Sequence, residues 1–372
     1  MKNILLGTTG LVGAVLLAAS ASAETPKVTV GGFIDFQAGF ANDDLDAAQR
    51  AQGFRNDSEV GVRVDGKSDS GLGYGAVIDL EADVTADSDN QGLNASRTYV
   101  YLDGGWGRFE LGSNQGASSA LSVGAEKIAV ATGGINGAWT YFANATGGNY
   151  VSTPELPIVH GSTAALGGET TDNINKITYY SPRFSGFQLG LSYAPDGTDR
   201  GQTVTRTDSA AGGVGDIIDA GLAYQGQFDA VKVGAALTTQ FGQADTNATE
   251  DLSAWNLGLN LGIQGFSLAG SYGDWGDSLR AKGSNNDASY WTAGLAYAGG
   301  PFGVSATYLD SDYENGAGAA SNDFNNLVLG ADYKLAPGLT PYAEVSFYEF
   351  DAPGTAADND GTVLILGTQL AF

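Results

Sequence analysis

The sequence predicts an all-β fold: a 16-stranded antiparallel up-and-down β-barrel that crosses a membrane. Three observations predict it. Bulky apolar residues alternate with small or polar ones, with a period of two, along most of the chain. Short and long connectors alternate between the expected strands. After residue 23, no apolar run reaches the roughly 18 residues that a spanning helix needs. Without such a helix, only a closed barrel satisfies the backbone in lipid.

The composition excludes several classes of protein. The chain has 372 residues, with 42 acidic and 17 basic residues, one His and no Cys. The absence of Cys excludes disulfides, Cys-based metal sites and thiol nucleophiles, and a single His excludes multi-histidine metal sites. A net charge of -25 argues against a nucleic-acid partner, which attracts Lys and Arg. Abundant Gly, at 56 residues, together with 10% aromatic residues, favours β structure.

Residues 1–23 have the pattern of a cleaved signal peptide. Lys2 supplies the positive start, residues 4–19 are apolar and uncharged, and Ala21-Ser22-Ala23 forms a small-residue cleavage site. A transmembrane helix is the alternative, but the run is short for one and ends in the cleavage pattern. We therefore expect an exported protein whose barrel domain occupies residues 24–372.

Sixteen segments show strand periodicity. In 187–193, 266–272 and 302–308, the bulky Phe, Leu, Val and Tyr residues all lie on one face, and small or polar residues occupy the other. One such strand fits a soluble sandwich as well as a membrane barrel; the whole set favours the barrel. The expected strands are 27–40, 54–67, 71–83, 95–103, 106–113, 174–182, 186–195, 216–226, 228–241, 252–263, 265–275, 288–298, 301–309, 324–336, 339–350 and 362–372.

The connectors between these strands predict a meander with two unequal rims. Seven are short turns and eight are long loops, and the two kinds alternate. An even number of strands lets the last strand pair with the first, which removes the free edges. The third long connector, residues 114–173, carries apolar residues such as Trp139 and Phe142, so we expect it to fold into the wide barrel and pack there.

Alternation also assigns faces to the charged residues of the first strands. Val60, Val62 and Val64 must face outward, which places Arg55 and Arg63 inside. By the same rule, the side chains that face inward also include Arg97, Tyr99, Tyr101, Asp103, Arg108, Glu110, Asp79, Glu81, Lys176 and Lys232. Tyr and Trp residues near the strand ends fit the aromatic girdles of a membrane barrel, although simple sheet packing predicts them too.

Three motifs resemble the general porins of Gram-negative bacteria, and the alphaproteobacterial type in particular. Residues 175–187 resemble the strand pair after the pore-constricting loop, and Val28-Thr29-Val30-Gly31-Gly32-Phe33 resembles a first strand after a signal peptide. Phe372, preceded at period two by Leu370, Thr368 and Leu366, resembles the insertion signal read by the outer-membrane assembly machinery. The resemblance implies a homotrimer in the outer membrane, in contact with lipid and lipopolysaccharide, that passes ions and small hydrophilic solutes by passive diffusion.

The resemblance also implies a pore site. In such porins, basic residues on the wall face acidic residues on the constricting loop, and the opposed charges create a transverse field. The wall candidates here are Arg55, Arg63, Arg97 and Arg108. The loop candidates are Glu126, Glu155, Glu169 and Asp172. Local ion pairs within the wall are the alternative for these charges.

Other functions stay open at this point. A substrate-selective channel or an outer-membrane receptor barrel would have the same strand pattern. An outer-membrane enzyme needs a nucleophile and a base, and His160 in the long connector has no evident strand-borne Ser partner, so no enzyme is expected. No cofactor is expected, although acid-rich stretches such as 310–315 and 358–360 carry Ca²⁺-type ligands, or simply form a solvated acidic rim.

Overall fold

The structure of the chain is a computed structural model. It describes residues 25–45, 50–82, 94–143, 150–151, 174–202, 204, 206, 213–284, 286–314, 321–351 and 358–372. The expected signal peptide lies outside these residues.

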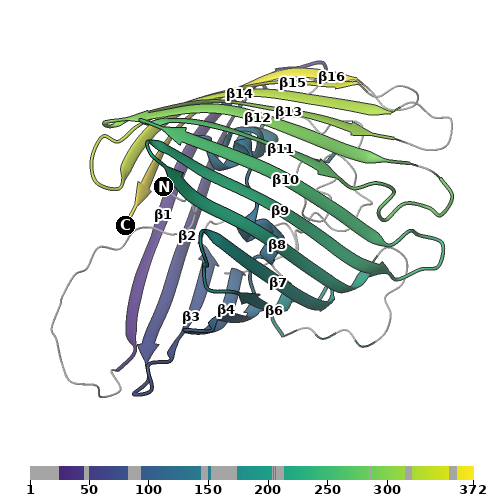
Figure 1. Cartoon of the computed structure of the whole chain (residues 1–372). Coiled ribbons are helices and arrows are strands. Elements are labelled where there is room, and N and C mark those ends of the chain that lie inside the picture. The colour runs from purple at the N-terminus through teal and green to yellow at the C-terminus, as the bar shows by residue number, and fades with distance from the viewer. Residues whose placement is uncertain are drawn as a thin grey trace.

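The predicted all-β fold of sixteen antiparallel strands is confirmed. Each strand pairs with its neighbours in sequence, and β16 pairs with β1 to close the barrel (Figure 1). The strands are β1 (Lys27–Asp43), β2 (Gln52–Lys67), β3 (Gly73–Glu81), β4 (Asn94–Gly104), β5 (Gly107–Ser113), β6 (Asn175–Tyr180), β7 (Phe187–Asp196), β8 (Val214–Phe228), β9 (Val231–Ala244), β10 (Leu252–Ile263), β11 (Phe266–Asp274), β12 (Ala288–Gly299), β13 (Phe302–Tyr313), β14 (Asn322–Tyr333), β15 (Leu339–Asp351) and β16 (Asn359–Ala371).

Four short helical turns follow β5 in the part of the third long connector that the structure describes. They are α1 (Ala117–Leu121), η1 (Ala125–Lys127), η2 (Gly134–Asn136) and η3 (Ala138–Tyr141). In the described ranges, no helix has the length and apolar character needed to cross a bilayer.

Several strands extend further than the alternation predicted. The segment 301–309 was expected to end before the acidic Asp310-Ser311-Asp312 stretch, but β13 continues to Tyr313. Leu309, Ser311 and Tyr313 are buried on the inward face, and Asp312 pairs with Asp323 across the sheet. The acidic residues alternate with buried ones, so the stretch is a strand that rises into the rim and not a loop.

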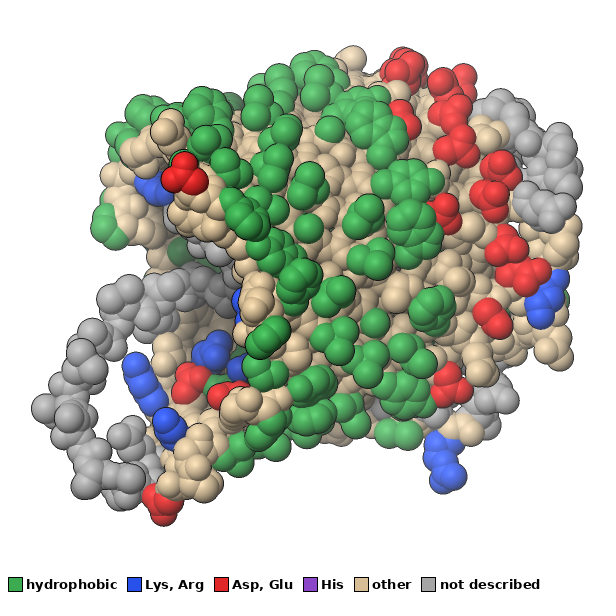
Figure 2. Space-filling model, in the orientation of Figure 1, with side chains coloured by type: hydrophobic (Ala, Val, Ile, Leu, Met, Phe, Trp, Pro, Cys, Tyr) green, Lys and Arg blue, Asp and Glu red, His purple; other side chains and the backbone are tan. Residues whose placement is uncertain are grey.

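The outward face of the wall is apolar and the rim beyond it is acidic. Leu257 in the middle of β10 is 54% exposed, and similar side chains cover the visible wall (Figure 2). Acidic side chains gather at the right-hand end in Figure 2, where the long connectors lie. An exposed apolar band bounded by polar rims is the surface that a bilayer covers.

The largest buried apolar cluster lies on the inner side of the wall. Trp139 and Tyr150 from the third long connector pack there with Phe324, Tyr348 and other inward residues of β10–β16. This location differs from a soluble β-sandwich, in which the core lies between two sheets. The inner side of the wall is therefore where buried polar and charged groups can meet, and where a functional site is to be sought.

Candidate functional site on the inner wall

The four arginines predicted to face inward do so, on β2, β4 and β5. Arg97 pairs across the sheet with Asp79 of β3, and Arg108 with Asp103 of β4. Directly paired residues share a face of the sheet. Val100 and Leu111, which pair with each other and lie an odd number of positions from Arg97 and Arg108 on the same strands, are exposed on the outer side. The strict period of two therefore places these guanidinium groups on the inner side of the wall.

Each of these arginines forms an ion pair with an acidic residue of the wall itself. Arg108 Nε lies 2.6 Å from Glu110 Oε1. The other pairs are Arg55 with Asp57 at 3.0 Å, Arg63 with Asp65 at 3.1 Å, and Arg97 with Asp79 at 3.5 Å. Among the described residues, wall acids are therefore the ion-pair partners of these arginines, and local ion pairs, the alternative considered from the sequence, are present. The predicted pairing across the pore with loop acids stays a prediction, because three of those acids lie outside the described residues.

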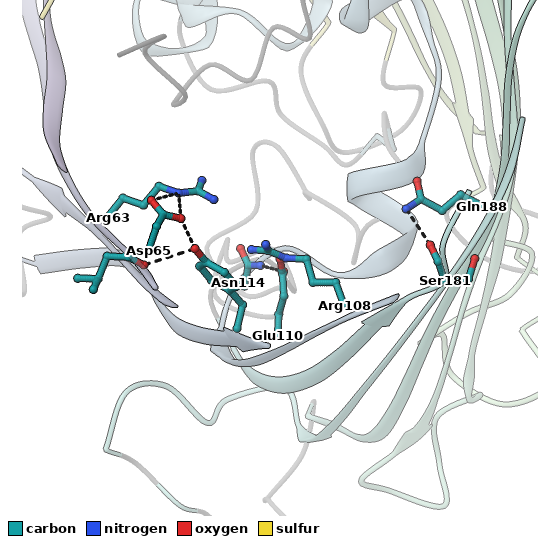
Figure 3. Close-up of polar contacts among 9 residues, drawn as sticks. Arg63, Asp65, Arg108, Glu110, Asn114, Ser181 and Gln188 are labelled. Atoms are coloured by element: carbon teal, nitrogen blue, oxygen red, sulfur yellow. Dashed lines mark hydrogen bonds and ion pairs between the residues drawn. The ribbon is translucent and has the colours of Figure 1, made fainter. Parts of the chain in front are cut away.

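Tyr101 connects two of these arginines. Its ring centroid lies 3.9 Å from the Arg108 guanidinium carbon and 5.6 Å from that of Arg63, and its hydroxyl donates to Asp65. Figure 3 shows the two arginines beside their acidic partners, Arg63 with Asp65 and Arg108 with Glu110. A cation over an aromatic face is attracted to the ring's negative charge density. Alternation predicted that Tyr101 faces inward, but it does not say which inward side chains the ring contacts, and Arg63 on β2 is not even on a neighbouring strand.

The loop candidates are only partly placed. Glu126 lies in η1 and is partly exposed. Glu155, Glu169 and Asp172 lie outside the described residues, as does His160. Lys176, also predicted to face inward, is buried and donates to the backbone oxygen of Asn114. Within the ranges that can be described, no group of three or more His, Cys, Asp or Glu residues is placed to hold a metal ion.

Residues 114–143, here called the inner segment, follow the inner side of the wall. Helix α1 contacts β6–β9, η1 contacts β11–β13, η2 contacts β13–β15, and η3 contacts β16. In a ring of sixteen strands, β10 lies opposite β2. The segment therefore lies mainly across the barrel from the arginine-bearing strands, and Arg55 meets its far end, 4.0 Å from the Tyr141 ring.

Polar side chains of the wall accept hydrogen bonds from the backbone of this segment. Asp219 accepts from the Ser118 N–H at 2.7 Å, and Glu344 accepts from the Thr132 and Gly134 N–H groups at 3.2 and 3.3 Å. Further wall acceptors are the hydroxyls of Ser192, Thr292, Ser305 and Thr307. Backbone groups removed from water need such partners, so these contacts fix the path of the segment.

An aromatic stack holds the end of the inner segment. The Trp139 ring lies 5.5 Å from that of Tyr348 and 6.0 Å from that of Phe324, and Tyr150 stacks on Phe324 at 3.9 Å. The Trp139 indole N–H donates to the Ile135 carbonyl at 3.1 Å. Such rings remove a large apolar area from water. The inner side of the barrel thus carries a fixed segment on one side and a charged wall on the other.

Comparisons with known proteins agree with this architecture. A family model described as Gram-negative porin matches residues 8–353. An uncharacterized protein of Rickettsia conorii (strain ATCC VR-613 / Malish 7) is 26% identical over 75% of this chain and 76% of its own. One of Rickettsia bellii (strain RML369-C) is 24% identical over the full length of both chains.

Solved structures show the same fold. The anion-selective porin from Comamonas acidovorans superposes with a TM-score of 0.65 at 21% identity, covering 94% of this chain and 100% of that one. OmpT of Vibrio cholerae, in its trimer form, superposes with a TM-score of 0.62 at 14% identity, with the same coverage.

Proposed function

The chain belongs to the Gram-negative porin family, and from this premise we propose that it forms a water-filled channel through which ions and small hydrophilic solutes diffuse passively across the outer membrane. The observation that carries the proposal is the pairing of a charged inner wall with an anchored inner segment on the opposite side of a closed barrel. A sixteen-stranded barrel is wide enough for an aqueous interior. Passive diffusion needs no chemistry, so no catalytic role is assigned to any residue.

The narrow part of this channel is proposed to lie between the third long connector, residues 114–173, and the arginine-bearing wall. Arg55, Arg63, Arg97 and Arg108 would line one side, and Glu126, Glu155, Glu169 and Asp172 would supply the acidic side. Opposed charges across a narrow aqueous neck orient water and disfavour apolar solutes. Support comes from the inward placement of the four arginines and from the fixed path of the inner segment.

Three further proposals concern the export of the protein, its insertion into the outer membrane and its assembly there. Residues 1–23 would direct export and be cleaved, and Phe372 would be read by the outer-membrane assembly machinery. A homotrimer, surrounded by lipid and lipopolysaccharide, is supported by the trimer form of the similar OmpT. The exposed apolar band of the wall supports a membrane setting for each protomer.

Planar-bilayer recording tests the channel function. Purified protein added to a lipid bilayer in KCl should produce stepwise current increases with a linear current–voltage relation. Heat-unfolded protein in the same detergent is the control. A preparation that contains folded barrels but never produces steps would overturn the proposal, and saturable block of the current by one class of solute would instead favour a substrate-selective channel.

A further inference from the structure

We propose that a line of inward-facing glycines seats the inner segment, and that Gly258 determines how far this segment projects toward the arginine-bearing wall, and so how wide the channel is. The line, here called the glycine track, consists of Gly190, Gly221, Gly258, Gly294 and Gly330 on β7, β8, β10, β12 and β14. The effect on channel width rests on the proposed function; the position of the segment does not.

The glycines of the track lie beneath successive parts of the inner segment, with Gly190 and Gly221 both beneath Ala117 and Leu121 and the other three further along. A Cβ placed on Gly190 would lie 2.8 Å from Leu121 Cδ1, and one on Gly221 would lie 3.2 Å from the Ala117 carbonyl oxygen. Further along, a Cβ on Gly294 would lie 3.0 Å from Ala125 Cβ, and one on Gly330 would lie 3.2 Å from the Val130 oxygen. At these four positions the segment therefore lies closer to the wall than an ordinary Cβ contact of 3.4 Å or more would allow.

Gly258 has the tightest contact. A Cβ there would lie 1.7 Å from the Val123 carbonyl oxygen and 2.6 Å from its carbonyl carbon. Both are backbone atoms, so no side-chain rotation relieves the overlap. Gly258 lies within the regular strand β10 and outside the positive-φ glycines of the fold, so its backbone conformation suits any residue. The position needs glycine for space and not for conformation.

Hydrogen bonds on both sides of Val123 limit how the segment can respond. Ser118 N–H is held by Asp219 at 2.7 Å, and Ala125 N–H by the Thr292 hydroxyl at 3.3 Å. With these two points held, Val123 can move away from β10 more easily than along the wall. Because β10 lies opposite β2 in the ring, this displacement points toward the side of the barrel that carries Arg55 and Arg63.

The test compares Gly258→Ala with Gly262→Ala. Gly262 lies on the same face of the same strand, but a Cβ there meets only ordinary contacts, 3.6 Å from Lys232 Cβ and 3.8 Å from the Phe266 oxygen. We expect Gly258→Ala to lower single-channel conductance by on the order of a tenth to a third, because pore cross-section limits ion flow, and Gly262→Ala to match the wild type. Equal conductance of all three proteins would overturn the inference.

A second single variant with a less severe contact, and a double variant that partly compensates for it, keep the test valid if Gly258→Ala does not fold. Gly294→Ala brings a methyl group to 3.0 Å from the methyl of Ala125. We expect a smaller fall in conductance, and we expect the double variant Ala125→Gly/Gly294→Ala to recover part of that fall, because the new Cβ still lies 3.2 Å from Ala125 Cα. A double variant that conducts like Gly294→Ala alone would contradict the seating role.

A crystal structure of Gly258→Ala tests the position of the segment without using conductance. Moving the Val123 oxygen from 1.7 Å to an ordinary contact of 3.4 Å requires a shift of about 1.7 Å away from β10. A segment that stays in place while β10 deforms would overturn the inference. If the wild type forms no channel but this shift is seen, then the proposed function fails and the glycine track stands.

Discussion

Single buried carboxylates of the wall fix the inner segment. Glu344 is almost fully buried and accepts hydrogen bonds from the Thr132 hydroxyl and from the N–H groups of Thr132 and Gly134. A carboxylate offers only acceptors, which suits a site where every neighbour is a donor. Asp219 does the same for Ser118. Two residues thus hold two separate turns of the segment against the wall.

Replacing Glu344 with Gln should destabilise the protein. The amide of Gln carries two N–H donors that would face the Thr132 and Gly134 donors, leaving buried groups without partners. We expect the free energy of unfolding to fall by about 1–3 kcal/mol, measured by urea titration with tryptophan fluorescence. Glu349→Gln is the matched control, because Glu349 lies on the outward face of the same strand. Equal losses in both variants would contradict the anchoring role.

Arg97 offers a test of charge on the inner wall. Its guanidinium lies 3.5 Å from Asp79. Arg97→Gln removes the arginine that is ion-paired with that carboxylate and makes the inner wall more negative, so the reversal potential in a KCl gradient should move toward cation preference. Arg183→Gln is the control, because Arg183 is exposed in the short turn between β6 and β7, where it donates to Gln188. A shift toward anions, or one no larger than that of Arg183→Gln, would argue against pore lining by Arg97.

At the scale of the element, each strand separates a lipid face from an inner face. Outward aromatic pairs mark both ends of the apolar band: Trp255 with Tyr272 toward the long connectors, and Phe266 with Tyr297 toward the short turns. Rings with a polar edge prefer the membrane interface. Leu257 and Leu259 of β10 lie between these two levels and are exposed to the membrane side.

Two arginine substitutions in β10 should distinguish the outward, lipid-facing side of the strand from its inward side by their effect on stability. Leu257→Arg places a charge on the lipid face, and we expect it to cost about 2–4 kcal/mol of folding free energy in a bilayer. Asn260→Arg, on the inward face of the same strand, should change stability little because its side chain reaches the aqueous interior. The measurement is reversible folding into lipid vesicles, followed by urea titration. Similar costs for both variants would contradict the assigned faces.

At the scale of the whole molecule, the charge is unevenly distributed. More than half of the 42 acidic residues lie in the long connectors and at their rim, whereas the inner wall of β2–β5 holds four arginines, each beside an acid. The acidic excess attracts cations to the mouth of the barrel, and salt screens this attraction over a Debye length of about 10 Å at 0.1 M.

The selectivity of the wild-type channel should therefore depend on salt. We expect cation preference in a dilute KCl gradient and a smaller preference above about 1 M, where the Debye length falls to about 3 Å. Permeation of a small neutral sugar, measured by liposome swelling, is the control and should not change with salt. A selectivity that is constant across the whole range would show that charge fixed at the neck, and not the rim, decides it.

Alternation along each strand was enough to predict the sixteen strands, their order and the inward placement of Arg63, Arg97 and Arg108. Strand ends were predicted less well where acidic residues resemble a turn. At Asp310 the acidic stretch suggested a loop, but pairing with β14 continues β13 to Tyr313. The partners of the arginines were not predicted, because a pattern of faces does not say which of several inward acids lies nearest.

The sequence by itself determined the barrel, because face and strand order follow from residues that are adjacent or joined by short turns. Only the tertiary structure decided the path of the inner segment. Its anchors join residues 101 and 210 positions apart, Ser118 with Asp219 and Gly134 with Glu344. Gly258 and Gly262 look alike in the sequence of β10. Gly258 lies beneath the Val123 carbonyl, whereas Gly262 meets only ordinary contacts with the wall. The difference arises because the folded inner segment covers the inner face of β10 at Gly258 and does not reach Gly262.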